Sequence, residues 1–374
     1  MADATTTRPL GSSRVASIDA LRGFDMMWIV GGAEVTRSLH KVIHNPVMDT
    51  LGPQLDHVEW QGFHFYDLIF PLFVFIAGVV LPFSLTRRLE AGANRTEIYK
   101  HLVRRLVLLF FLGVVYNGLL DLNFHELCIT GVLQRIAVCY FFTGLVMMNT
   151  GVRGQAWVAG GLLVIYWLVM KLVPVPGVGA GIFTPAGNLS GFIDRHLLPR
   201  PFCCCEYTFG DAEGILSTIP AISTCLMGAL AGHWLRSSRP AARKLLGLAV
   251  AGLASLALGL IWSHWFPIIK TLWTSSYVLF AAGWSLLLLG LFYWIIDVRG
   301  YRRWAFFFTV IGLNSITIYV VRSQFDFRTV ANVFVRGFID YLGPYKPAFY
   351  DFSGFVVGWL FLWFLYRQRI FLKV

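Results

Sequence analysis

The chain has 374 residues, of which 57% are hydrophobic, 16% aromatic and only 14% charged. Soluble domains carry roughly 25% charged residues, so this composition excludes an ordinary soluble globular protein. A net charge of +11 would suggest nucleic-acid binding in a soluble protein, but here we attribute it to loops that flank membrane spans. We therefore expect membrane lipid, and no nucleic acid, as a partner.

Apolar stretches of about 20 residues recur along the chain, and this length crosses roughly 30 Å of hydrocarbon. We predict an all-α, polytopic membrane bundle with about ten transmembrane helices. A polar tail over 1–17 is followed by one transmembrane domain over 18–374. The predicted spans are 18–36, 65–86, 102–120, 129–149, 155–174, 213–235, 245–266, 274–296, 305–321 and 348–366.

Lys and Arg are distributed unevenly between the two sides of this predicted bundle. Both terminal segments and the loops after spans two, four, six and eight hold 19 of the 31 basic residues, against 9 in the opposite loops. Because cytoplasmic loops carry an excess of Lys and Arg, we predict that both termini are cytoplasmic. His57 then lies in the first external loop.

Ionisable groups inside spans cost about 2.5–3.5 kcal/mol on insertion scales, so each suggests a site. In span one, Arg22 and Asp25 lie three positions apart on one helical face, where a structural ion pair is the alternative to a ligand site. In span four, Gln134 and Arg135 offer an amide and a bidentate guanidinium that suits phosphate or carboxylate. An interhelical ion pair is the alternative for Arg135.

His57 precedes span two, and an imidazole there can transfer a proton near neutral pH. Asp67 opens span two, where helix capping explains it, but its position ten residues later also lets it orient the imidazole. Asp211 and Glu213 precede span six in the same way, and a helix start is again the alternative.

Three further polar residues lie in the C-terminal half. Lys270 lies in the short connection between spans seven and eight, where a lone Lys usually extends to water. Asn314 and Ser315 lie inside span nine, where they either link helices or contact a ligand.

Histidines and cysteines show no HExxH or other metal-ligand spacing, so we expect no metal site. Cys128, Cys139 and Cys225 lie in or beside apolar spans, where a free thiol is usually a small buried hydrophobe. The run Cys203–Cys205 leaves a disulfide open.

A series of motifs stands in order along the chain: Asp19-Ala20-Leu21-Arg22-Gly23, His57-x-x-Trp60-x-Gly62, Asp67-Leu68-x-Phe70-Pro71, Gly131-Val132-Leu133-Gln134-Arg135, Asp211-x-Glu213-Gly214, Lys270-x-Leu272-Trp273 and Gly312-x-Asn314-Ser315. Together they resemble the heparan-alpha-glucosaminide N-acetyltransferase family, in the form of a bacterial member. Two departures are present. Gly31-Gly32-Ala33-Glu34 stands where the animal pattern carries an Asn, and Asp211-Ala212-Glu213-Gly214 stands where the family has Asp-Pro-Glu-Gly.

The resemblance implies an enzyme of the bacterial inner (cytoplasmic) membrane. Such an enzyme transfers an acetyl group from cytoplasmic acetyl-CoA to the amine of a glucosamine-type sugar at the outer face. The family's proposed catalytic histidine falls on His57, as a general base or as a nucleophile that forms an acetyl-imidazole, with Asp67 as its orienting group. We assign Arg22, Gln134, Arg135, Lys270, Asn314 and Ser315 to acetyl-CoA, and Trp60, Asp211, Glu213 and Trp273 to the sugar.

Two other functions remain open from the sequence. One is a transporter of an amino sugar or cell-wall fragment, although no paired Gly/Pro-broken segments indicate inverted repeats. The other is a membrane O-acyltransferase that acts on a glycan, because a hydroxyl acceptor needs the same base and thioester site. The natural acceptor sugar and the formation of a homodimer are also open.

Overall fold

The computed structural model describes residues 15–122, 127–198 and 210–372. They form helices and connections, with one isolated bridge between Val175 and Gly179 and no strand within the described ranges. The helices are α1 (Ala16–Met27), α2 (Ala33–His40), α3 (Pro46–Gln54), α4 (Ile69–Leu81), α5 (Arg87–Glu90), α6 (Arg95–Tyr116), α7 (Val132–Asn149), α8 (Val152–Leu172), α9 (Leu189–Leu197), α10 (Thr218–Arg236), α11 (Ala241–Trp262), α12 (Ser275–Phe292), α13 (Ala305–Leu313), α14 (Ser315–Gln324), α15 (Phe327–Val335) and α16 (Lys346–Arg367).

Six helical segments of the described chain are long and apolar enough to cross a membrane. They are Phe65–Glu90, Val132–Asn149, Val152–Leu172, Ala241–Trp262, Ser275–Val298 and Ile339–Arg367. The helices α13 and α14 form a seventh if they count as one span, although they are bent by 69° relative to each other. The prediction of an all-α polytopic membrane protein is confirmed. The predicted number of ten stays a prediction, because α1–α2, α6 and α10 lie at predicted spans but do not meet this criterion.

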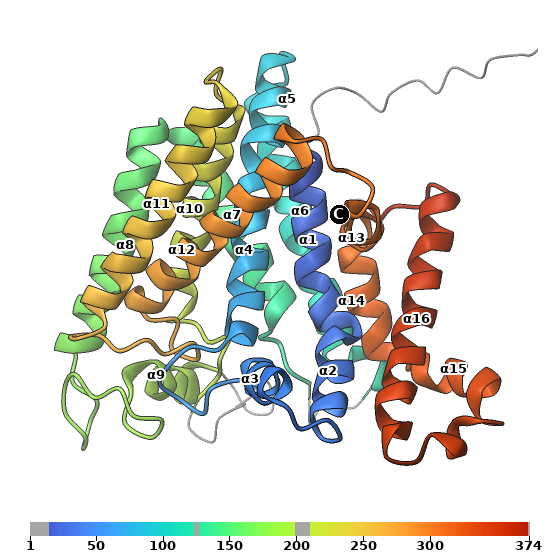
Figure 1. Ribbon diagram of the computed structural model, residues 1–374. Helices are drawn as coiled ribbons and strands as arrows, with labels where there is room; N and C mark the ends of the chain where they lie inside the picture. Colours follow the sequence, from blue (N-terminus) through green and yellow to red (C-terminus); the bar gives the residue numbers. More distant parts are fainter. Residues whose placement is uncertain (1–14, 123–126, 199–209, 373–374) are drawn as a thin grey trace, which may run out of the picture.

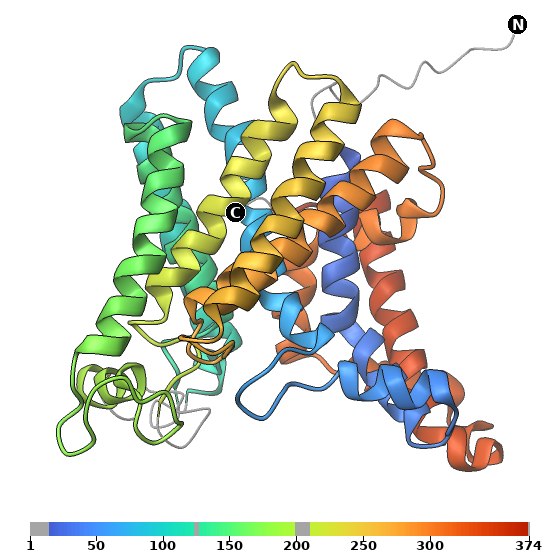
Figure 2. The ribbon, with the colours of Figure 1, turned by 60° about the vertical axis from the view of Figure 1, so that its left-hand side comes forward.

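The long helices run roughly along one direction, with α4 inside the bundle (Figure 1). The helix α4 packs against α1, α7, α10 and α12. The short helices α3, α9 and α15 gather at one end of the bundle, and α5 lies at the other (Figure 1). A second view shows the same arrangement, with α3 and α9 at the lower end (Figure 2).

Glycines let two pairs of helices approach closely. A Cβ at Gly78 of α4 would overlap the carbonyl oxygen of Cys225 in α10, and one at Gly228 of α10 would overlap that of Phe75 in α4. The same relation joins α1 to α13, where a Cβ at Gly312 would overlap the Asp19 carbonyl oxygen. Small residues at such contacts allow backbones in a membrane bundle to pack directly.

One of the three predictions of free cysteines is wrong. Cys139 and Cys225 are free and buried, as predicted. Cys128, which we expected to be a free thiol, is disulfide-bonded. The run Cys203–Cys205 lies outside the described residues.

Candidate active site

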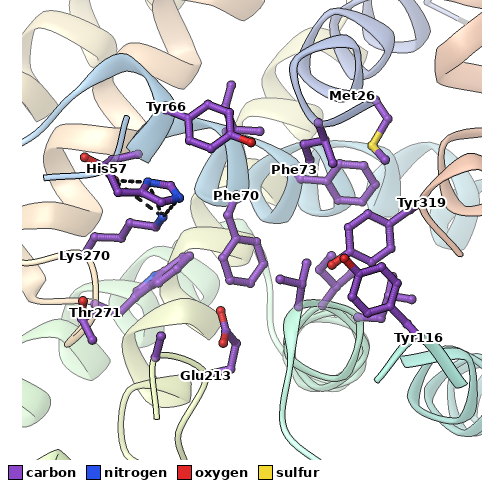
Figure 3. A pocket seen from close by; sticks show the side chains of 18 of the residues that line it. Met26, His57, Tyr66, Phe70, Phe73, Tyr116, Glu213, Lys270, Thr271 and Tyr319 are labelled. Carbon is purple, nitrogen blue, oxygen red and sulfur yellow. Dashed lines mark hydrogen bonds and ion pairs between the residues drawn. The ribbon is translucent and has the colours of Figure 1, made fainter. Parts of the chain in front are cut away.

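A cavity of about 340 Å³ lies at the end of the bundle that carries α3 and α9. Residues from α1, α4, α6, α7 and α14 line it, together with the connections that precede α4, α10 and α12. Figure 3 shows His57 and Lys270 at one side of the cavity, with Tyr116 and Tyr319 at the other. The wall between them is aromatic and apolar, with Phe70 and Phe73. The cavity therefore joins a charged end to an apolar end.

His57, Asp67 and Lys270 form a hydrogen-bonded group at the charged end. The distance from His57 Nδ1 to Asp67 Oδ1 is 2.7 Å. Lys270 Nζ lies 3.0 Å from His57 Nδ1, 3.2 Å from Nε2 and 3.5 Å from Asp67 Oδ1. Because Asp67 is the acceptor at Nδ1, the lone pair of the neutral imidazole is assigned to Nε2.

Local backbone structure fixes Asp67 at the start of span two. Its side chain is fully buried, and Oδ2 accepts hydrogen bonds from the backbone N–H groups of His64 at 3.0 Å and Val58 at 3.4 Å. The Tyr277 hydroxyl donates to the Asp67 carbonyl oxygen at 2.8 Å. Asp67 therefore caps a helix and contacts the imidazole at once, so the two interpretations of this residue do not compete.

Two residues that were not predicted to belong to the site, Tyr66 and Arg37, support the imidazole. The Tyr66 ring lies 4.8 Å from the His57 ring, measured between centroids. The Arg37 guanidinium lies 4.7 Å above the Tyr66 ring and is 2.9 Å from Asp56, the residue before His57. The His57 side chain nevertheless remains 50% exposed. Tyr66 could have been noticed as the neighbour of Asp67, but no local pattern indicates Arg37.

Six of the twelve predicted site residues line the cavity: His57, Trp60, Asp67, Glu213, Lys270 and Trp273. Trp60 Nε1 donates to the Phe183 carbonyl oxygen at 2.8 Å, which ties the His57 segment to the long connection before α9. Trp273 is almost fully buried, and its Nε1 donates to Thr224 at 3.1 Å. Lys270, which we assigned to acetyl-CoA, contacts the imidazole directly.

Arg135 lies behind the cavity wall. It is buried, its Nη2 donates to Ser217 Oγ at 2.5 Å, and its guanidinium lies 4.9 Å from the centroid of Trp273. Gln134 is also buried and does not line the cavity. In this arrangement Arg135 supports Trp273 from behind.

Replacing Arg135 with alanine should lower the stability of the protein. The change removes the donor to Ser217 and the packing behind Trp273, and a lost buried hydrogen-bond partner costs about 1–3 kcal/mol. The measurement is thermal unfolding in detergent, together with the KM for acetyl-CoA, and Arg153→Ala at the start of α8 serves as control. An unchanged melting temperature with a raised KM would instead support direct binding of acetyl-CoA by Arg135.

Arg22, Asn314 and Ser315 do not line the cavity. Arg22 Nη1 lies 3.5 Å from Asp19, and it donates to the Gly312 carbonyl oxygen at 3.4 Å. The alternative of an Arg22–Asp25 ion pair is wrong, because Asp25 is buried with no hydrogen-bond partner among the described residues. Asn314 lies at the bend between α13 and α14.

The acidic residues before α10 have different environments. Asp211 is buried and accepts from the Thr130 hydroxyl and, at 2.8 Å, from the backbone N–H of Glu213. It does not line the cavity, whereas Glu213 does. Asp194 of α9 accepts from the Ile215 backbone N–H at 3.0 Å, and burial raises its pKa to about 6. These contacts hold the segment from which Glu213 faces the cavity.

Comparisons with known proteins agree with the resemblance of the motifs. Residues 14–120 match a family model described as a domain of unknown function, DUF5009. The human heparan-alpha-glucosaminide N-acetyltransferase is 28% identical over 323 residues, which cover 72% of this chain and 49% of the relative. The mouse protein of the same name is 26% identical over 371 residues, covering 84% and 54%. The chain thus spans about half the length of the curated relatives that it matches.

Proposed function

Because this chain is a distant relative of the heparan-alpha-glucosaminide N-acetyltransferases, we propose that it is an integral membrane N-acetyltransferase. The donor is acetyl-CoA, and the acceptor is the amine of a glucosamine-type sugar or glycan. The observation that carries the proposal is the His57–Asp67 pair, 2.7 Å apart, at the charged end of a cavity with an apolar interior. This arrangement supports a role for His57 as general base beside a space that suits the acetyl-carrying end of the donor.

The reaction forms a nitrogen–carbon bond, breaks a carbon–sulfur bond and moves a proton twice. The acceptor nitrogen attacks the thioester carbonyl carbon, His57 Nε2 takes a proton from that nitrogen, and the carbon–sulfur bond breaks. The imidazolium then returns the proton to the thiolate of CoA. In the two-step alternative, Nε2 attacks first and an acetyl-imidazole transfers its acetyl group to the amine. Asp67 stabilises the imidazolium in the first route and sets the tautomer in both.

Lys270 is the proposed hydrogen-bond donor to the oxyanion. Its ammonium lies 3.2 Å from His57 Nε2. Its flexible side chain is 22% exposed and can turn aside as the acceptor amine approaches Nε2. In that position it can donate a hydrogen bond to the oxyanion that forms on the thioester carbonyl.

The acceptor approaches from the half-exposed side of His57, where Trp60 and Glu213 lie at the cavity. Glu213 can accept hydrogen bonds from the ammonium or hydroxyl groups of the sugar, and Trp60 can pack against its ring. The acetylated pantetheine occupies the apolar interior between Phe70 and the stacked Tyr116–Tyr319 pair, whose centroids are 4.3 Å apart.

The proposed outer location of this end has a second support besides the distribution of Lys and Arg. Cys128 is disulfide-bonded, and its carbonyl oxygen accepts from Asn117, at the end of α6. Disulfides persist in oxidising compartments. We therefore propose an inner-membrane enzyme of a bacterium whose His57 end faces away from the cytoplasm.

The direct test uses purified protein in detergent with radiolabelled acetyl-CoA and glucosamine. We expect N-acetylglucosamine without any gradient, with the label resistant to base. Absence of product with a range of amino sugars, combined with gradient-dependent uptake in vesicles, would support a transporter instead. Base-labile product would identify an O-acyltransferase.

Replacing Lys270 with methionine should slow acetyl transfer. Methionine is also unbranched but cannot donate a hydrogen bond, so the oxyanion loses a donor and kcat should fall about 10²–10³-fold. The measurement is turnover with glucosamine. The Lys270→Arg variant keeps a charged donor and should retain more of the activity. An unchanged kcat in Lys270→Met would exclude this role.

A further inference from the structure

Three side chains with metal-binding atoms converge where α2 meets α3, outside the cavity. His40 ends α2, His44 lies in the following turn, and Asp49 lies in the first turn of α3. His40 Nε2 is 3.4 Å and His44 Nδ1 3.6 Å from Asp49 Oδ1, and the three atoms lie within 4.8 Å of one another. Both ribbon views show α2 beside α3 at one end of the bundle (Figures 1 and 2).

The distances suit a shared metal ion better than hydrogen bonds. An N–H···O hydrogen bond usually spans about 2.7–3.2 Å, and both separations are longer. Tetrahedral zinc binds nitrogen and oxygen donors at about 2.0–2.2 Å, which places neighbouring donors about 3.3–3.6 Å apart. The two His–Asp separations therefore match two edges of such a coordination polyhedron.

The backbone presents these donors in a fixed arrangement. Asn45, between the two elements, accepts a hydrogen bond from the Met48 backbone N–H at 2.9 Å, and Pro46 follows as the first residue of α3. The His40 ring lies so close to Gly52 that a Cβ there would overlap Nδ1. The Nδ1 side of the His40 ring thus packs against Gly52, and Nε2 faces Asp49.

We propose that His40, His44 and Asp49 bind a divalent transition-metal ion, with zinc as the best fit. Two imidazole nitrogens and one carboxylate oxygen suit zinc and its neighbours, whereas calcium and magnesium prefer all-oxygen sites. The exposed position lets water complete the coordination. From the sequence we expected no metal site, because these residues form no HExxH motif.

The position of the site gives the ion a structural role. The C-terminal end of α3 leads into Leu55 and Asp56, which Arg37 of α2 contacts, and the next residue is His57. An ion bound between α2 and α3 would therefore stabilise the segment that carries the proposed base. This inference about metal binding does not depend on acetyl transfer.

The test is zinc binding by full-length protein in detergent, after removal of any polyhistidine tag. Isothermal titration with Zn²⁺ should show one ion per chain, and Co²⁺ should give the absorption bands of a tetrahedral site. His44→Ala and Asp49→Asn should each weaken binding at least ~10-fold, because even the loss of an outer-shell partner costs about 10–100-fold. His264→Ala is the matched control, since this exposed histidine bonds only to carbonyl groups of its own helix.

Two results would overturn the proposal. One is the absence of saturable Zn²⁺ binding to the unmodified chain. The other is equal affinity in His44→Ala, Asp49→Asn and the control, which would place the ion elsewhere, for example at His57. Hydrogen exchange adds a second readout: Zn²⁺ should slow exchange of the α3 amides in the unmodified chain and not in Asp49→Asn. Unchanged exchange on binding would overturn the structural role.

Discussion

Replacing His57 with alanine should reduce kcat for acetyl transfer by about 10²–10⁴-fold, the usual contribution of a positioned general base. The protein should remain folded, because the ring is 50% exposed and contributes little to the core. Binding of acetyl-CoA should change little, since the apolar end of the cavity is untouched. The measurements are turnover with glucosamine, thermal unfolding, and titration with CoA.

Rescue by free imidazole can separate a missing base from a distorted site. The exposure of His57 leaves a path from solvent, so added imidazole should restore part of the activity of His57→Ala. It should not increase the activity of His264→Ala, which serves as the control. Full activity of His57→Ala without imidazole would remove His57 from the mechanism. Acetylated protein trapped after rapid mixing without acceptor, and absent in His57→Ala, would favour the acetyl-imidazole route.

Replacing Asp67 with asparagine should have an effect of similar size, about 10²–10⁴-fold in kcat. An amide can donate to Nδ1, which would move the proton of the neutral ring to Nε2 and remove the basic lone pair. The charge that stabilises the imidazolium is lost as well. The exposed Asp340, which pairs with Lys346 outside the site, gives the control variant Asp340→Asn.

A double-mutant cycle shows whether Asp67 acts through His57. Once His57 is alanine, adding Asp67→Asn should cost little further activity, because the two groups work as one unit. Independent, additive losses in the double variant would contradict this coupling. They would indicate that Asp67 mainly holds the start of span two through the N–H groups of His64 and Val58.

The class of fold and part of the candidate site could be predicted from the sequence. Apolar length predicts helices that cross a membrane, because it is a local property of each segment. The spacing of His57 and Asp67 also lies within one short stretch, so their contact could be expected before the fold was known. The orienting role of Asp67 itself stays a prediction, as do the other assigned roles.

Contacts between distant segments could not be predicted in this way. Lys270 meets the imidazole from a connection 213 residues later in the chain, so its charge suggested acetyl-CoA instead. Arg135 looked like an anion-binding group because its partners, Ser217 and Trp273, come from other elements. The disulfide of Cys128 was missed because a cysteine beside an apolar span resembles a buried thiol.

The close contact of α4 with α10 makes the position of Asp67 depend on two glycines. Gly78 and Gly228 set the depth at which α4 sits, and Asp67 stands at the beginning of that same helical segment. A methyl group added at either glycine would push α4 and α10 apart and displace the Asp67 carboxylate. Such a change would look like a chemical defect in a turnover assay although every reacting atom is intact. The effect of substitutions at Gly78 and Gly228 on turnover should therefore be measured together with that of substitutions at His57.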